Sequence, residues 1–285
     1  MLAGSGRAVN RYVHLTNGFH GRGSPGGEVP RSIEPGRSVG SRLLEILFAF
    51  RPGRSRLSLA DLTRATGLPH ATARRHVLEL VRAGALDRAV DGTFTVGIRL
   101  WELGTLAPLS VPLRTVAQPF MEDLYTALHE HVQLAVREGN EAVVVERLSA
   151  NDAVGIVSQV GGRLPLHSSG VGKVLLAHTG ADDAEQVIAA GLPRFTARTI
   201  TDPARLRVSL ADCRATGVAT VREEMSPRAD SVATRVMDAD GTVVAALSVV
   251  VRAGTVDLRA LTPSVIASGL GISRRLGWTP RVGVR

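Results

Sequence analysis

Apolar residues recur with helical spacing in the first part of the chain that shows any periodicity. The segment 39–50 has apolar residues every three or four positions, which predicts an amphipathic helix that ends before Pro52. A second helix is predicted from Ser58, which can cap its first turn, to Gly67, which can end it. A third is predicted to begin near Pro69. Two short helices joined through a glycine turn are typical of a helix-turn-helix.

The pattern after the third helix changes to short strands. Asp91 and Gly92 form a strong hairpin signal between two strand-like runs. A hairpin that directly follows the second helix of a helix-turn-helix indicates a wing. The stretch IRLWELGTLAP, residues 98–108, then predicts a connecting helix. The first third of the chain is therefore predicted to be a winged helix.

The remainder alternates between helices and antiparallel hairpins. Turns at residues 138–140 and 240–241 each join two apolar strands, and a final helix is predicted over roughly 256–276. Residues 1–38 are rich in Gly, Pro, Arg and Ser and have no periodicity. We therefore expect an α+β fold in four segments: a disordered N-terminal extension over 1–38, a winged helix-turn-helix domain over 39–100, a linker helix over 101–116, and a sensory-type α+β domain over 117–280.

Positive charge is concentrated in the first third. The whole chain carries a net charge of +8, and 33 of its 34 basic residues are Arg, which by itself indicates a compositional bias without function. Residues 1–104, however, hold 15 Arg against 8 acidic residues, whereas residues 105–285 hold 19 basic against 18 acidic residues. A basic module joined to a nearly neutral one favours a reader of nucleic acid attached to a sensing or assembly domain.

The third predicted helix divides into a buried and a basic face. Ala73, Val77 and Leu80 fall on one side. The opposite side and the wing carry the residues that we predict to contact DNA: His70, Thr72, Arg74, Arg75, Arg82 and Arg88. The arginine fork pairs with guanine edges or phosphates, and the first turns of a recognition helix are the part that enters the major groove. The alternative is a solvated face that happens to be basic. We interpret His76 as a hydrogen-bonded histidine near the edge of the core.

Several other chemistries are excluded or disfavoured by the sequence. A single cysteine, Cys213, allows neither a disulfide framework nor a cysteine zinc site. The stretch SSGVGKV lacks the glycine and hydroxyl positions of a phosphate-binding loop. No histidine pattern indicates a metal site, no apolar run is long enough to cross a membrane, and Glu223 with Glu224 is interpreted as a solvated or salt-bridged turn. We expect no catalytic residues, no metal, no cofactor, and a location in the cytoplasm.

The sequence resembles the IclR family of bacterial transcription regulators. The resemblance is carried by LSLADLTRATGLPHATARRHVLELVRAGALDRAVDGTFTVGIRLWELG, by LPLHSSGVGKVLLA at 164–177, and by GVATVREE and DGTVVAALSV, and it covers about residues 39–278. It implies a homodimer or tetramer that binds double-stranded operator DNA, with a GAF-like C-terminal domain that binds a small molecule. A repressor of a catabolic operon is favoured over the alternatives, an enzyme or an assembly module with a vestigial DNA-binding domain.

The same resemblance implies an effector pocket. Its residues, matched position by position, are Gly170, Val171, Val221, Ala229, Ser231, Ser248 and Val250. The helix start at Gly170 and Val171 matches the place where family members hold a carboxylate, which suits the free amides of a helix N-terminus. Val221 stands where one well-studied type of the family has an acid, Val250 replaces a possible Ser, and Arg228 stands where glycine is common. We therefore expect a small organic acid with a hydrocarbon body.

Overall fold

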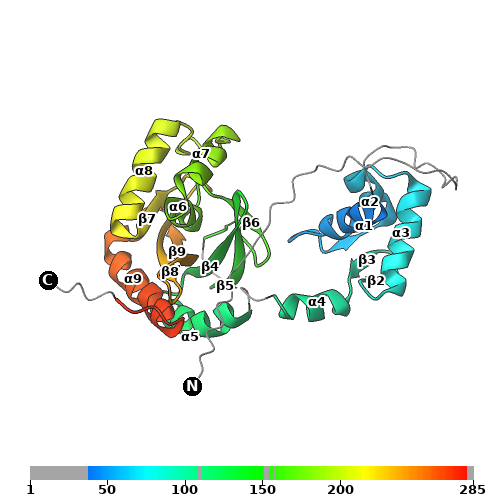
Figure 1. Ribbon diagram of the computed structural model, residues 1–285, viewed down its shortest axis with the longest axis horizontal. Helices are drawn as coiled ribbons and strands as arrows, with labels where there is room; N and C mark the ends of the chain where they lie inside the picture. Colours follow the sequence, from blue (N-terminus) through cyan, green and yellow to red (C-terminus); the bar gives the residue numbers. More distant parts are fainter. Residues whose placement is uncertain (1–37, 108–110, 151–153, 157, 281–285) are drawn as a thin grey trace, which may run out of the picture. The chain divides into compact units, whose positions relative to one another are not determined.

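The computed structural model describes residues 38–107, 111–150, 154–156 and 158–280. Of Val111, only the backbone is described. Apart from Ser38, the predicted N-terminal extension lies outside this range, so its disorder stays a prediction. Figure 1 shows the elements coloured along the chain. The helices and strands before residue 108 and those after residue 110 are described separately below.

The first group of elements is a winged helix. It comprises α1 (Val39–Phe48), β1 (Arg56–Leu57), α2 (Leu59–Thr66), α3 (His70–Arg82), β2 (Leu86–Arg88), β3 (Phe94–Val96) and α4 (Ile98–Thr105). The three strands form a small antiparallel sheet in the order β1-β3-β2. The predicted helix-turn-helix and its wing are both confirmed.

Local sequence signals explain the boundaries of α2. The amide of Asp61 donates to Ser58 Oγ, and the amide of Ser58 donates to the Asp61 carboxylate, both at 3.1 Å. This reciprocal capping box satisfies amides that the helix itself cannot. Gly67 ends the helix with φ at +66°, a conformation that favours glycine. The turn between α2 and α3 is therefore determined locally.

The core of the winged helix is small and apolar. Ile46 from α1, Leu62 from α2 and Val77 from α3 are fully buried. Leu86 and Phe94, from the two strands of the wing, complete the cluster. Because the wing contributes to this core, α3 is held between the other helices and the hairpin, with one face open.

The single linker helix that we expected over 101–116 differs from the observed elements. In its place are α4, which ends at Thr105, and α5 (Val111–Leu128). Pro112, in the first turn of α5, favours a helix start there, because proline lacks the amide that a helix interior needs. Leu113 and Ala117 lie four residues apart and are both buried in one cluster, so α5 packs as a unit from its first turn.

The second group of elements forms a six-stranded antiparallel sheet with helices on both faces. After α5, it comprises β4 (His131–Glu138), β5 (Glu141–Leu148), β6 (Arg163–Pro165), α6 (Gly170–Ala177), α7 (Ala181–Ala189), α8 (Pro203–Thr216), β7 (Val218–Arg222), β8 (Ala229–Met237), β9 (Val243–Arg252) and α9 (Leu258–Arg275). The strand order is β6-β5-β4-β9-β8-β7. The predicted α+β class is confirmed.

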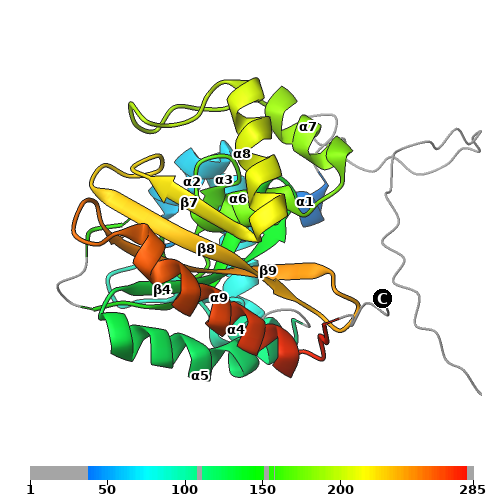
Figure 2. The same cartoon turned by 90° about the vertical axis from the view of Figure 1, so that its left-hand side faces the viewer.

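The two faces of this sheet build two separate cores. Helices α5 and α9 cover one face, where they pack on Leu134 and Leu247. Helices α6, α7 and α8 cover the other face, as Figure 2 shows, and pack around Ala135 and Ala246. Small residues on the second face let α6 approach the strands closely. Helix α6 itself is buried along its whole length.

Candidate functional site

Helix α3 presents a basic face that no other described element of the winged helix covers. His70, Arg74 and Arg75 are exposed, Thr72 is half-buried, and Ala73 on the opposite side is fully buried. Within the described residues, no carboxylate pairs with either arginine. An unpaired guanidinium keeps all its donors available for an external acceptor such as phosphate or a guanine edge. The placement fits a recognition helix, although base contact by these residues stays a prediction.

The remaining predicted DNA-contacting residues lie at the end of α3 and on the wing. Arg82 and Arg88 are at least partly exposed. At the tip of the wing, Val90 is fully exposed, and Asp91 pairs with Arg56 of β1 at 3.2 Å. A hydrogen bond from the Thr93 hydroxyl holds the pKa of Asp91 below its usual value. The tip is therefore fixed to the sheet at its acidic residue and leaves its basic and apolar side chains outward.

His76 is not the hydrogen-bonded histidine that we expected. Its side chain is 1% exposed, and neither ring nitrogen has a hydrogen bond to any described residue. The nearest charged group is the Glu79 carboxylate, 3.6 Å from Nδ1. The interpretation was wrong because helical spacing places His76 beside Val77 and Ala73, inside the core rather than at its edge.

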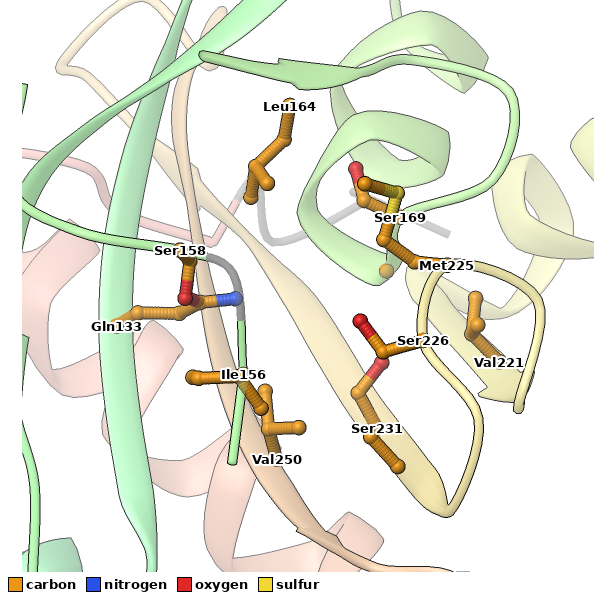
Figure 3. A pocket seen from close by; sticks show the side chains of 12 residues that line it. Gln133, Ile156, Ser158, Leu164, Ser169, Val221, Met225, Ser226, Ser231 and Val250 are labelled. Atoms are coloured by element: carbon orange, nitrogen blue, oxygen red, sulfur yellow. The ribbon is translucent and has the colours of Figure 1, made fainter. Parts of the chain in front are cut away.

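A cavity lies in the second domain between the sheet and the start of α6. The space between its lining atoms is about 400 Å³, part of which is open to solvent. Figure 3 shows the side chains that surround it. They are Gln133, Ile156, Ser158, Leu164, Ser169, Gly170, Val221, Met225, Ser226, Ala229, Ser231 and Val250.

The structure brings together most of the predicted effector residues. Gly170, Val221, Ala229, Ser231 and Val250 line this cavity. Val171 and Ser248, which were also predicted, are fully buried and do not line it. The backbone amide of Val171 still belongs to the first turn of α6, so its predicted role does not need an exposed side chain. That these residues bind a ligand stays a prediction.

The start of α6 is pressed against the sheet. A Cβ atom at Gly170 would come within 2.7 Å of Ser231 Oγ, so this position accepts only glycine without a shift. Ser169 caps the helix: its Oγ accepts from the Gly172 amide at 3.1 Å and donates to the Pro165 carbonyl at 2.7 Å. The amides of Gly170 and Val171 are the first two of the helix, which an α-helix leaves without internal acceptors. They and the positive end of the helix dipole favour an anion here.

One wall of the cavity is held by two side chains of the sheet. His131 Nε2 lies 2.5 Å from the Val154 carbonyl, and Nδ1 lies 3.0 Å from Ser149 Oγ. Burial lowers the pKa of His131, so the neutral imidazole donates through Nε2 and accepts at Nδ1. Arg147 Nη1 donates to the Ser158 carbonyl. These contacts fix Val154 and Ser158 on either side of Ile156.

The opposite wall is the connection between β7 and β8, residues 223–228, which we call the β7–β8 loop. Met225 and Ser226 of this loop face the cavity. Glu223 and Arg228 have φ of +53° and +65°, in the left-handed region that favours glycine. A left-handed backbone at residue 228 explains why glycine is common there in the family, and Arg228 adopts it without being glycine. The carboxylate of Glu223 stabilises this backbone conformation of Arg228, because it accepts a hydrogen bond from the Arg228 amide at 2.9 Å.

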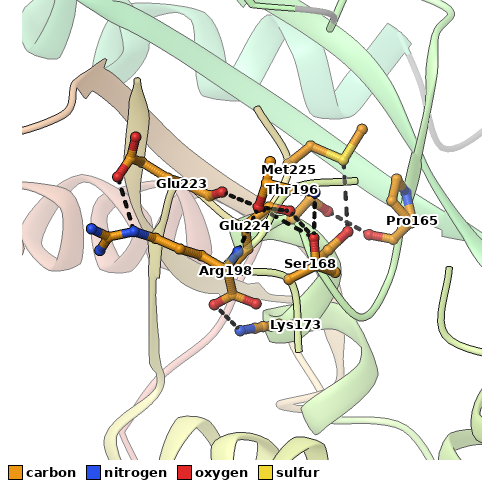
Figure 4. A network of polar contacts seen from close by, with 10 residues as sticks. Pro165, Ser168, Lys173, Thr196, Arg198, Glu223, Glu224 and Met225 are labelled. Carbon is orange, nitrogen blue, oxygen red and sulfur yellow. Dashed lines mark hydrogen bonds and ion pairs between the residues drawn. The ribbon is translucent and has the colours of Figure 1, made fainter. Parts of the chain in front are cut away.

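A polar network connects the β7–β8 loop to α6 and to the segment that contains Thr196 and Arg198, as Figure 4 shows. Thr196 Oγ1 donates to the Glu223 carbonyl at 2.6 Å, and Arg198 pairs with the Glu223 carboxylate at 3.1 Å. Lys173 Nζ, on α6, donates to Glu224 Oε1 at 2.6 Å, and these two side chains are 1% and 9% exposed. Burial lowers the pKa of Lys173, and the attraction of Glu224 opposes that shift. The expected turn is thus salt-bridged, but Glu224 is buried rather than solvated.

Sequence reasoning missed several cavity residues. Gln133 had a usable signal: it is a lone polar residue in the apolar run HVQLAV, on the same face of β4 as Ala135. Ser158 and Met225 lie in irregular segments, where periodicity does not indicate which side chains face the cavity.

In the part of the chain that the structure describes, no helix is long and apolar enough to cross a membrane, and no group of side chains is arranged to hold a metal ion.

Comparison with known proteins gives the family. The IclR helix-turn-helix domain matches residues 41–89, and the bacterial transcriptional regulator IclR C-terminal domain matches residues 107–274. Among characterised relatives, the HTH-type transcriptional repressor AllR of Klebsiella pneumoniae is 33% identical over 80% of this chain and 84% of its own length. The HTH-type transcriptional regulator KipR of Bacillus subtilis is 29% identical over 85% of this chain and 97% of its own length.

A solved structure supports the same family assignment. An IclR homologue from Microbacterium hydrocarbonoxydans, complexed with 4-hydroxybenzoate, is 36% identical, covers 84% of this chain and 99% of its own, and superposes with a TM-score of 0.80. The order of the two domains fits this likeness. The chain therefore belongs to the IclR family of bacterial transcriptional regulators, and it is a DNA-binding transcription regulator.

Proposed function

We propose that this protein is a cytoplasmic repressor whose affinity for operator DNA is changed by a small carboxylate bound in the cavity at α6. The observation that carries the proposal is the cavity itself. It places the first amides of α6 over Ser231, whose cross-strand neighbours Val221 and Val250 give the cavity an apolar lining. Such a site suits an acid with a hydrocarbon body. The homologue complexed with 4-hydroxybenzoate supports this class of ligand.

The DNA-reading part of the proposal rests on α3 and the wing. His70, Thr72, Arg74 and Arg75 would meet base edges and phosphates in the major groove, with Arg82 and Arg88 on the flanking backbone. One such module covers few base pairs. We therefore infer that two copies bind an inverted repeat, with recognition helices about one helical turn apart.

Helix α4 is the surface that we propose to join the two copies. Ile98, Trp101, Leu103 and Leu106 are 63%, 66%, 64% and 76% exposed. No residue of α4 is buried among the described residues of a single chain. Apolar side chains at this density are typical of a surface that is covered in the assembled protein. A second copy of the same helix offers a matching apolar surface, which favours a homodimer or a tetramer built from dimers.

Thermal stability in the presence of carboxylates tests the effector site. A panel of aromatic and aliphatic acids, with 4-hydroxybenzoate among them, is added to wild type and to Val250→Phe, which fills the cavity. A true effector raises the melting temperature of wild type by mass action and fails to raise that of the filled variant. Val160→Phe is the matched control, because Val160 is 49% exposed and lies outside the cavity.

The proposal is overturned if no acid stabilises wild type, or if a folded Val250→Phe protein responds as wild type does. The second result places the ligand elsewhere. Circular dichroism establishes that each variant is folded before its response is compared.

A further inference from the structure

Unpartnered polar atoms gather on the strand side of the cavity. Gln133 is 5% exposed and Ser158 is 4% exposed, yet Gln133 Oε1 and Ser158 Oγ have no hydrogen bond to any described residue. Ser248 is directly opposite Gln133 in the pairing of β4 with β9, and its fully buried Oγ is also without a partner among the described residues. Figure 3 shows Gln133 and Ser158 projecting into the cavity, across from Ser169 and Met225.

This cluster of unpaired polar atoms lowers the stability of the folded protein. A buried polar atom without a hydrogen bond destabilises the folded protein, because it is removed from water without a replacement partner. The neighbours of Gln133 along β4, Val132 and Leu134, point to the opposite face of the sheet, where they are fully buried and apolar, so Gln133 is the one of these three that faces the cavity. Unpaired buried atoms beside a cavity point to a group that is supplied from outside.

The chemistry of these atoms selects the group. Gln133 Oε1 only accepts, so it requires a donor, while the Ser158 hydroxyl and the Gln133 amide nitrogen can donate. A hydroxyl group on a ligand both donates and accepts, so it can donate to Gln133 Oε1 and accept from the Ser158 hydroxyl or the Gln133 amide nitrogen. A carboxylate only accepts: it could take hydrogen bonds from the Gln133 amide nitrogen, which Figure 3 shows toward the cavity, and from Ser158, but it would leave Gln133 Oε1 unpaired. The Ser158 carbonyl is already held by Arg147, so this wall is preorganised.

We propose that Gln133, together with Ser158, reads a hydroxyl group on the effector, so that the effector is a hydroxylated carboxylic acid. Gln133 is then the residue that determines specificity at the end of the ligand remote from its carboxylate. The inference rests on the proposed function, in which the carboxylate lies at the start of α6.

Titration calorimetry on the full-length protein with matched probes tests the inference. The probes are 4-hydroxybenzoate, benzoate and terephthalate, which differ only at the para position. Wild type is expected to bind the hydroxylated acid about tenfold or more tighter than benzoate, since a site built for a hydroxyl leaves its polar groups unpaired with the bare analogue. Terephthalate, with a second carboxylate, is expected to bind more weakly than 4-hydroxybenzoate.

In Gln133→Leu, the preference for the hydroxyl is expected to fall to within about threefold, with the affinity for benzoate retained or improved. Ser158→Ala, whose backbone carbonyl still accepts from Arg147, is a second variant that should weaken the preference. Gln159→Leu is the matched control, because Gln159 is exposed and outside the cavity. It should keep the preference of wild type.

Each contrary outcome has a distinct meaning. If benzoate and 4-hydroxybenzoate bind wild type equally, the wall holds water only and the inference is wrong. It is also wrong if terephthalate binds tightest, or if both folded variants, Gln133→Leu and Ser158→Ala, keep the full preference. If wild type binds a non-hydroxylated acid in the cavity and no hydroxylated one, the inference fails while the proposed function stands. If no acid binds at all, both fail.

Discussion

Replacing Lys173 by Met tests whether the buried ion pair holds the β7–β8 loop in place. Lys173 and Glu224 are almost completely removed from solvent, and their charged atoms are 2.6 Å apart. Lys173→Met keeps much of the side-chain volume and removes the charge. It leaves the Glu224 carboxylate buried, with Oε2 already lacking a partner among the described residues of the wild-type protein.

The expected decrease in stability is large. Removing one member of a buried ion pair costs about 3–5 kcal/mol, because the other charge stays buried and uncompensated. In a domain of this size, 1 kcal/mol corresponds to about 2–4 °C in melting temperature, so the variant should melt roughly 6–20 °C lower. The double variant Lys173→Met, Glu224→Leu removes both charges and should recover most of the decrease, since two apolar residues replace the pair at little net cost.

Denaturant unfolding of wild type, both single variants and the double variant gives the coupling free energy of the pair. Titration with a cavity-binding carboxylate at a temperature where every variant is folded gives the effect on the loop. We expect weaker binding in Lys173→Met, because Met225 and Ser226 face the cavity from the loop that Glu224 anchors. A destabilisation below about 1 kcal/mol in Lys173→Met, or a double variant no more stable than it, would refute the reasoning.

The other predictions concern the DNA-binding face, its core and the response to acid. Changing Arg74 and Arg75 together to Ala should weaken operator binding by about 1–3 kcal/mol for each base that these side chains no longer bind; a mobility shift measures this, and unchanged affinity in a folded variant excludes α3 as the recognition helix. His76→Leu should stabilise the winged helix by about 1 kcal/mol in chemical denaturation, because it removes an unpaired buried imidazole; a decrease in stability would show that the Glu79 contact matters. Burial is the main cause of a lowered pKa in His131, and two further histidines of the second domain share this shift, namely His167 and His178. Below about pH 6.5 the unfolded chain therefore binds more protons than the folded one, so stability is full above that pH and falls as pH decreases; a melting temperature flat between about pH 7 and 5 would contradict this.

Much of the winged helix was predictable because its signals are local. The capping box of Ser58 with Asp61, the glycine stop at Gly67 and the turn at Asp91 and Gly92 each act over a few residues. The same periodicity that located α3 was not enough to interpret His76. Whether a histidine inside a core finds a hydrogen-bond partner depends on the neighbouring elements, and the pattern along one helix does not contain them.

The cavity was only partly predictable, for a physical reason. The residues on regular elements, such as Gly170, Ser231 and Val250, could be matched position by position with the family. The β7–β8 loop could not, because its wall depends on a buried contact between Lys173 and Glu224, which are 51 residues apart. Arg228 is intermediate: its departure from glycine was visible in the sequence, but its left-handed backbone was not.

The central claim is that a carboxylate in the cavity changes the affinity of this protein for its operator. The most direct measurement is a mobility shift with full-length protein and the promoter DNA that it protects in footprinting, with and without a saturating acid identified by thermal shift. We predict a change of at least about fivefold in operator affinity for wild type, a typical allosteric coupling, and none for Val250→Phe. Equal operator affinity in wild type with and without a bound acid would contradict the account.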